Sequence, residues 1–199
     1  MTNTAKKIVI LLGHSAKDSH CRRLADAYEG GARGAGHTVE RFDIGDLYFD
    51  PVLHDGYRTI QDLEPDLIRF QEALKGADHF VILYPNWWSG PPAILKGFFD
   101  RVWLPGFAYQ YIKLRSGHNT PFWHRLLKGK TARLIVTTGM RPMFLRMLYG
   151  NFLQQVSVGI LWFAGLRVEE TVFGPTDGPH HAREDAWVAQ ARSLGARAK

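Results

Sequence analysis

The sequence predicts an α/β fold in which one parallel sheet of five strands carries helices on both faces. Short apolar or alternating runs recur along the 199 residues, and a helical pattern follows each of them. The composition, with 45% hydrophobic and 22% charged residues, is that of an ordinary globular protein. Since no repeat or linker interrupts this rhythm, we expect a single domain over residues 1–199.

Each element follows from a local pattern. Ser19 is suited to cap the first helix. The glycines at 30, 31, 34 and 36 resemble a glycine-rich dinucleotide-binding loop, but such a loop follows a strand, whereas these follow a helix. We therefore expect them to end the helix. The rhythm fits the five-stranded flavodoxin-like doubly wound order better than a six-stranded dinucleotide fold. Strands are predicted at 7–12, 38–43, 79–84, 132–137 and 167–173, and further helices at 63–76, from Pro91 onward, over most of 143–164 and at 182–197.

Charge and cysteine content restrict the class of protein. The formal net charge of +6 attracts anions, but the basic residues are scattered and no nucleic-acid motif is present, so we expect no nucleic-acid partner. Cys21 cannot form an internal disulfide, and no apolar run is long enough for a membrane span or signal-peptide core; we therefore expect a cytoplasmic protein. The adjacent His180 and His181 point apart, and we expect no metal site.

Ligands of such sheets bind beyond the carboxyl ends of the strands, which selects three loops. The first, residues 13–19, leads into a helix N-terminus and offers Ser15, Lys17 and Ser19, a set suited to a phosphate. Cys21 lies in the next helical turn, where we expect it to pack rather than react.

The second loop, residues 84–92, combines Trp87 and Trp88 with prolines and a glycine. Consecutive tryptophans cannot both face one core, so this loop is predicted to bind a planar ligand or a partner. The third loop, residues 137–142, offers hydroxyl groups and a flexible backbone to polar ligand edges.

The most specific pattern is YPNWWSGPPAILKGFFDRVWLPGFAYQY, residues 84–111. Together with GHSAKDS (13–19), TTG (137–139) and LWFAGLRV (161–168), it resembles the flavodoxin-like NAD(P)H:quinone reductase family. That family includes the mammalian quinone reductases, bacterial drug-activity modulators and ancillary subunits of potassium efflux systems. The similarity extends over nearly the whole chain.

The resemblance implies a flavin held at the interface of a homodimer. His14 and Ser19 would contact the flavin phosphate, with Ser15 and His20 as neighbouring candidates. The remaining contacts implied by the resemblance are Pro85, Asn86, Trp87, Trp88 and Ser89 around the flavin ring, and Thr137, Thr138 and Gly139 at its N1/O2 edge.

The catalytic side chains are less well defined. Tyr109 would lie on the substrate wall that faces the partner subunit. The mammalian enzymes carry a tyrosine and a histidine after the third loop, whereas residues 140–155 contain no histidine, so that pair cannot be carried over. Tyr149, Arg141 and Arg146 are the alternative donors, which leaves Tyr109 and Tyr149 as the catalytic candidates.

The family's activity is hydride transfer from NAD(P)H, through the flavin, to a quinone or similar small aromatic acceptor. The backbone N–H groups of Thr138, Gly139 and Met140 are candidates to stabilise the negative charge of the reduced flavin. The adenine-binding C-terminal extension of the mammalian enzymes is missing, so we expect FMN, with FAD still open. Two alternatives remain: a flavin-binding regulatory subunit docked on a membrane transporter, and a flavodoxin-type electron carrier, a class whose usual acidity the positive charge opposes.

Overall fold

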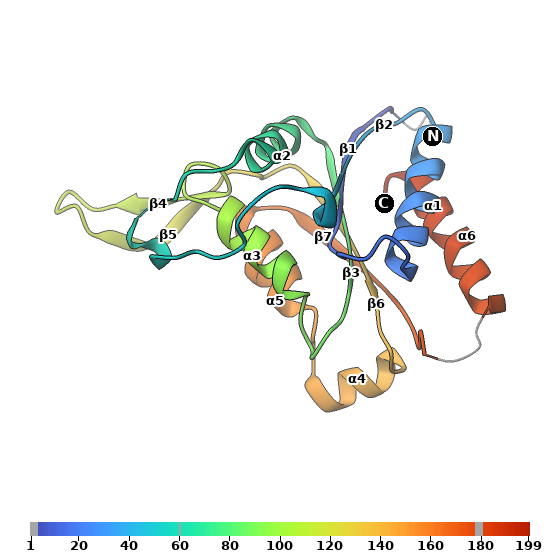
Figure 1. The fold of residues 1–199 in the computed structure, drawn as a ribbon. Coiled ribbons are helices and arrows are strands. Elements are labelled where there is room, and N and C mark those ends of the chain that lie inside the picture. Colours follow the sequence, from blue (N-terminus) through green and yellow to red (C-terminus); the bar gives the residue numbers. More distant parts are fainter. Residues whose placement is uncertain (1–3, 60, 178–180) are drawn as a thin grey trace.

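A central sheet of five parallel strands organises the computed structural model, which describes residues 4–59, 61–177 and 181–199 (Figure 1). The chain runs through the sheet in the doubly wound order expected from the sequence. The strand order across the sheet is β2 (Thr38–Asp43), β1 (Lys7–Leu12), β3 (His79–Pro85), β6 (Thr131–Thr137) and β7 (Arg167–Phe173).

Helices cover both faces of this sheet (Figure 1). One face carries α1 (His20–Gly34) and α6 (His181–Arg197), and the other carries α2 (Pro65–Gly76), α3 (Ala93–Val102) and α5 (Gln154–Val156) with the π-helical Ser157–Trp162. Within β1, Ile8 and Ile10 pack toward the first face and Val9 toward the second, which explains the uninterrupted apolar run. No helix among the described residues is long and apolar enough to cross a membrane.

The pairing of α1 with α6 corrects one prediction. Helix α1 continues through Gly30 and Gly31 and ends only at Gly34. Gly31 lies directly against the backbone carbonyl of Arg192, and Gly195 lies against that of Tyr28, so a side chain at either glycine would collide with main chain. Gly31 and Gly195 therefore allow close packing of the two helices. The prediction that Gly30 and Gly31 end the helix is wrong, whereas the helix does end at Gly34.

A two-stranded antiparallel hairpin, β4 (Tyr109–Lys113) and β5 (Asn119–Arg125), was not predicted. It projects from the sheet at the left of Figure 1. Its register shifts between Tyr111 and Lys113, and Pro121 lies within the second strand; both features weaken the pattern on which a sequence-based strand prediction depends.

The long helix expected over 143–164 is broken. Helix α4 covers only Pro142–Tyr149, because Gly150 adopts a φ of 64° and ends it. The Asn151 side chain then accepts a hydrogen bond from the Leu153 backbone N–H at 3.3 Å, before helical structure resumes at Gln154. Short 3₁₀ turns lie at Ile44–Asp46 and Gly56–Arg58.

Candidate functional site

The first loop leaves β1 at the carboxyl edge of the sheet, where the Gly13 N–H still donates to Leu83 O at 2.7 Å. The Ser19 hydroxyl accepts a hydrogen bond from the Arg22 N–H at 3.2 Å, which confirms Ser19 as the cap of α1. Ser15 is held close to the backbone of Gly45, at a spacing that a Cβ on residue 45 would violate. The helix N-terminus therefore faces solvent beside a firmly placed loop, as an anion site requires.

His14 connects the first loop to the second. Its Nδ1 accepts a hydrogen bond from the Ala16 N–H at 2.9 Å, and its ring meets the Trp87 ring edge-on, with centroids 5.4 Å apart. Burial, together with the nearby Arg22 cation, lowers the pKa of His14 below its ordinary value. A neutral imidazole that accepts at Nδ1 carries its proton on Nε2, which makes His14 a hydrogen-bond donor for a ligand.

The second loop contains a tight turn with unusual backbone. Trp87 and Gly90 exchange two backbone hydrogen bonds of 3.0 Å, and the residues between them, Trp88 and Ser89, have φ values of 51° and 62°. Non-glycine residues adopt this left-handed conformation at a cost, and such strain concentrates at ligand sites. The turn projects the Trp88 side chain fully into solvent and leaves Trp87 half exposed, so neither ring belongs to the core.

Two buried oxygen atoms in this loop have no hydrogen-bond partner: Asn86 Oδ1 and Ser89 Oγ. Asn86 lines a cavity of about 340 Å³ between the second and third loops, together with Pro85, Trp87, Trp88, Thr137 and Gly139. Buried polar groups are nearly always paired in native proteins, so unpaired ones beside a cavity indicate an expected ligand.

The third loop contributes less than the sequence predicted. The Thr138 N–H donates to Phe173 O at 2.9 Å, and the Thr138 hydroxyl donates to Met140 O at 2.8 Å, so both groups are already used within the protein. The prediction that the Thr138 N–H stabilises a ligand charge is therefore wrong. The N–H groups of Gly139 and Met140 have no acceptor among the described residues, and they are the donors that remain.

A loop after the fifth strand also reaches the cavity. Thr176 and Asp177 line it, and the Thr176 N–H holds the third loop by donating to Thr138 O at 2.9 Å. Neither residue was predicted, although both follow the carboxyl end of β7, where the rule that selects the other three loops applies equally.

His20 has a protein partner. Its Nδ1 lies 2.8 Å from Glu184 Oε1 of α6, and Arg23 Nη1 lies 2.9 Å from the same oxygen. This cluster joins the first turn of α1 to α6. His20 therefore has a structural role in holding the first loop, besides its predicted contact with a ligand. Since His180 lies outside the described residues, the expectation about the His180–His181 pair has no structural counterpart.

Cys21 is a packing residue, as predicted. It is buried, and its Sγ shares a 3.3 Å hydrogen bond with Thr137 Oγ1. Burial raises the pKa of the Cys21 thiol to about 12, so the thiolate that reacts with electrophiles is scarce at neutral pH.

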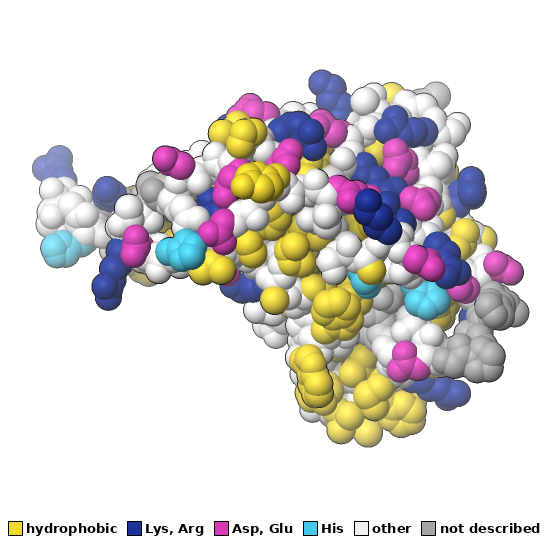
Figure 2. Space-filling model, viewed as in Figure 1, with side chains coloured by type: hydrophobic (Ala, Val, Ile, Leu, Met, Phe, Trp, Pro, Cys, Tyr) yellow, Lys and Arg dark blue, Asp and Glu magenta, His cyan; other side chains and the backbone are white. Residues whose placement is uncertain are grey.

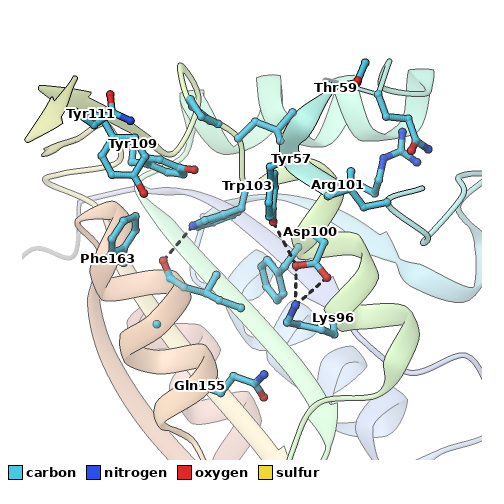
Figure 3. A pocket seen from close by; sticks show the side chains of 18 residues that line it. Tyr57, Thr59, Lys96, Asp100, Arg101, Trp103, Tyr109, Tyr111, Gln155 and Phe163 are labelled. Carbon is cyan, nitrogen blue, oxygen red and sulfur yellow. Dashed lines mark hydrogen bonds and ion pairs between the residues drawn. The ribbon is translucent and has the colours of Figure 1, made fainter. Parts of the chain in front are cut away.

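Tyr109 lies in a different and larger cavity, of about 760 Å³ (Figure 3). Its ring packs edge-on against those of Tyr111 and Phe163, with both centroid distances 5.2 Å. The pKa of Tyr109 is raised, first by burial and then by Tyr111. Trp103 completes an aromatic wall suited to a flat acceptor.

The opposite side of this large cavity is polar (Figure 3). Lys96 Nζ contacts both Asp100 carboxylate oxygens, at 2.6 and 2.7 Å, and the Tyr57 hydroxyl donates to Asp100 at 3.5 Å. The buried Arg101 guanidinium donates to Asp62 O and to the Glu64 carboxylate, which secures the long connection between β2 and α2 against α3.

The two catalytic candidates are not brought together. Tyr149 is exposed on α4 and lines neither the 340 Å³ cavity nor the 760 Å³ cavity. The two cavities share no lining residue; Gln155, which lines the larger one, lies beside Gly90 of the second loop and is the bridge between them.

The residues at the carboxyl edge fit a flavin mononucleotide unit. The N-terminus of α1 suits its phosphate, and the cavity that Asn86 and Trp87 both line suits a planar ring with polar edges. The free Gly139 and Met140 N–H groups suit the ring edge on which charge accumulates. Fold and site together define a doubly wound protein with a candidate ligand site at its strand switch point.

Comparison with known proteins gives the family. The family model described as flavodoxin-like fold matches residues 6–197, and the chain belongs to that family. It is 30% identical over 190 residues to NAD(P)H dehydrogenase [quinone] 1 of Cavia porcellus, covering 83% of this chain and 66% of that protein. It is 33% identical over 148 residues to human ribosyldihydronicotinamide dehydrogenase [quinone], covering 71% of this chain and 61% of that protein.

Among solved structures, the chain is similar to the NAD(P)H:quinone oxidoreductase of Methanothermobacter marburgensis. The TM-score is 0.80 at 25% identity, and the match covers 98% of this chain and 100% of the other. The chain spans about two thirds of the length of the curated mammalian relative it matches.

Proposed function

We propose that this protein is a flavin-dependent oxidoreductase that passes hydride from NAD(P)H to a quinone or similar aromatic acceptor. The observation that carries this proposal is a cavity formed by the carboxyl-end loops of a flavodoxin-like sheet and lined by Asn86, whose buried side-chain oxygen has no partner in the protein. The relatives named above, which are called quinone dehydrogenases and oxidoreductases, support the reaction class.

The protein's own groups would position the reactants. His14 and the N-terminus of α1 would hold the phosphate, and the Trp87 ring would limit where the flavin ring can lie. The N–H groups of Gly139 and Met140 would favour negative charge on the ring edge. A bound flavin would supply the hydride chemistry, and no acid–base pair of the protein is needed for it.

We propose FMN as the flavin, because the first loop offers one helix N-terminus and thus one phosphate site. Acid release of the bound flavin and mass measurement would distinguish FMN from FAD. A second copy of the chain would complete the acceptor site, since the aromatic wall around Tyr109 and the proposed flavin cavity share no lining residue. Light scattering tests this dimer, and a monomer at micromolar concentration would contradict it.

The decisive experiment uses Asn86→Ala. If Asn86 Oδ1 serves a ligand, the variant loses about tenfold or more in flavin affinity, the equivalent of a lost hydrogen bond in a buried site. Its apo form keeps the wild-type melting temperature or exceeds it, because removing an unpaired buried oxygen removes a penalty. The matched control is Thr138→Val. The Thr138 hydroxyl donates a hydrogen bond to Met140 O, so removing it should lower the melting temperature of the apo protein.

Anaerobic stopped-flow absorbance then tests the reaction. Protein reconstituted with FMN is mixed with NADPH or NADH, and afterwards with a quinone. Loss of the flavin band followed by recovery on quinone addition supports the reductase and identifies the preferred nucleotide. Flavin that binds but is reduced by neither nucleotide would favour the regulatory alternative, although none of the relatives named above is a transporter subunit. A protein that binds no flavin would refute the proposal.

A further inference from the structure

Helix α4 exposes an unusual apolar surface. Of its eight residues, Leu145 alone is buried, whereas Met143 and Met147 are 70% and 75% exposed. Phe144, Leu148 and Tyr149 are exposed as well, and Figure 2 shows hydrophobic side chains gathered over this end of the molecule. Large contiguous apolar patches on a protein surface mark an interaction site.

The charge on α4 itself is positive, although Glu170 and Asp177 lie nearby. Residues 101–168 contain no Asp or Glu, and two arginines are exposed: Arg141, directly before α4, and Arg146, in its last turn. Neither arginine forms an ion pair among the described residues. Glu170 lines a shallow hollow with Arg146 but makes no ion pair with it. A helix that carries exposed apolar side chains, unpaired cations and no acidic residue of its own is complementary to an anionic lipid surface.

The shape of the helix supports the same partner. Helix α4 stands at the carboxyl end of the sheet as a protruding element (Figure 1), which suits a flat surface. A second copy of α4 is a less suitable partner. A twofold contact between two α4 helices would bring Arg141 and Arg146 of both copies together, and these like charges would repel. The position is also functional, since α4 begins three residues after Gly139, which lines the candidate flavin cavity.

We propose that α4 docks the protein on a membrane surface that contains anionic lipids, with Met143 and Met147 entering the headgroup region. The mouth of the candidate flavin site would then face the bilayer. The proposed docking does not depend on the proposed activity. If the activity is as proposed, docking also predicts the substrate class: the acceptor would be a lipid-soluble quinone with an apolar tail, taken from the membrane.

Vesicle flotation tests the docking surface. Wild-type protein is mixed with phosphatidylcholine vesicles, with or without a minor fraction of phosphatidylglycerol. An arginine near an anionic surface strengthens binding by about fivefold, so two predict about 30-fold tighter binding to the anionic vesicles, reversed by salt. The variant Met143→Glu/Met147→Glu should lose at least about tenfold of this binding.

The matched control is Tyr48→Glu/Ile68→Glu. It changes the net charge equally at exposed apolar positions near α2, at the opposite end of the molecule in Figure 1, and it should float like wild type. Equal loss in both variants would overturn the proposal, because general attraction by the basic protein would then explain binding. Absence of wild-type flotation would overturn it too, as would an α4 variant that binds vesicles normally but changes from dimer to monomer.

Turnover separates docking from the proposed function. With a long-chain quinone in anionic vesicles, Met143→Glu/Met147→Glu should lower kcat/KM about tenfold, while a short-chain soluble quinone is reduced as by wild type. Equal rates on both quinones would refute the lipid-soluble acceptor. A wild-type protein that floats but reduces neither quinone would refute the proposed function and leave the docking surface standing.

Discussion

The contact between α1 and α6 predicts that Gly31→Ala destabilises the protein, against the usual preference of helices for alanine. Alanine in a helix interior is favoured over glycine by about 1 kcal/mol. At Gly31, however, the new Cβ would overlap the Arg192 carbonyl, a backbone group that cannot rotate away. The helices must separate, and such overpacking costs about 1–3 kcal/mol, sometimes more. We expect net destabilisation of up to about 2 kcal/mol, equivalent to a fall in Tm of about 4–8 °C.

The effect should reach the candidate site, because Glu184 of α6 holds both His20 and Arg23 at the start of α1. Displacing α6 loosens this cluster, so flavin affinity should fall together with Tm. Gly34→Ala in the same helix is the matched control, since a Cβ there meets nothing within 4 Å. Differential scanning fluorimetry and flavin titration measure both effects. If Gly31→Ala proved as stable as Gly34→Ala, the inference of close backbone contact would be wrong.

Three further predictions concern buried or charged groups. His79 is buried, its Nε2 has no partner, and burial is the main cause that lowers its pKa to about 3. The unfolded state binds this proton more tightly than the native state does, so the free energy of unfolding decreases as pH falls below about 6.5. Between pH 7 and 5, the free energy of unfolding of the wild type should fall by about 2 kcal/mol more than that of His79→Gln. Denaturant titrations measure this difference, and equal losses would contradict the prediction. Cys21 should react with a thiol reagent at pH 8 only at the rate of unfolding; fast labelling of native protein would refute its burial. Under the proposed function, Asp177→Asn should raise the reduction potential of the bound flavin by about 40 mV. This is the effect of removing one negative charge about 8 Å away at an effective dielectric constant of about 20. An unchanged potential would show that Asp177 does not act electrostatically on the flavin.

The sequence was sufficient for the sheet because the inner strands β1, β3 and β6 are buried on both faces and are therefore almost continuously apolar, whereas the edge strands β2 and β7 alternate. It also identified the first, second and third loops, since the carboxyl-end rule depends only on strand order. The role of Gly31 could not be predicted, because a packing glycine and a helix-ending glycine look alike until the partner helix is placed. The free and occupied donors of the third loop were equally hidden, because Thr138 loses its N–H to Phe173, 35 residues away.

The candidate site lies where the chain departs from the rules that the rest of the fold obeys. Trp88 and Ser89 occupy left-handed backbone, and Asn86 buries an oxygen without a partner, departures that each cost on the order of 1–3 kcal/mol. Costs of this size take a substantial part of the 5–15 kcal/mol by which a domain is stable. They persist because β3 and β6, which hold these loops, are buried on both sides and paired along their length. A ligand that pairs with Asn86 recovers part of that cost as binding energy, which is why the same residue can weaken the free protein and strengthen the complex.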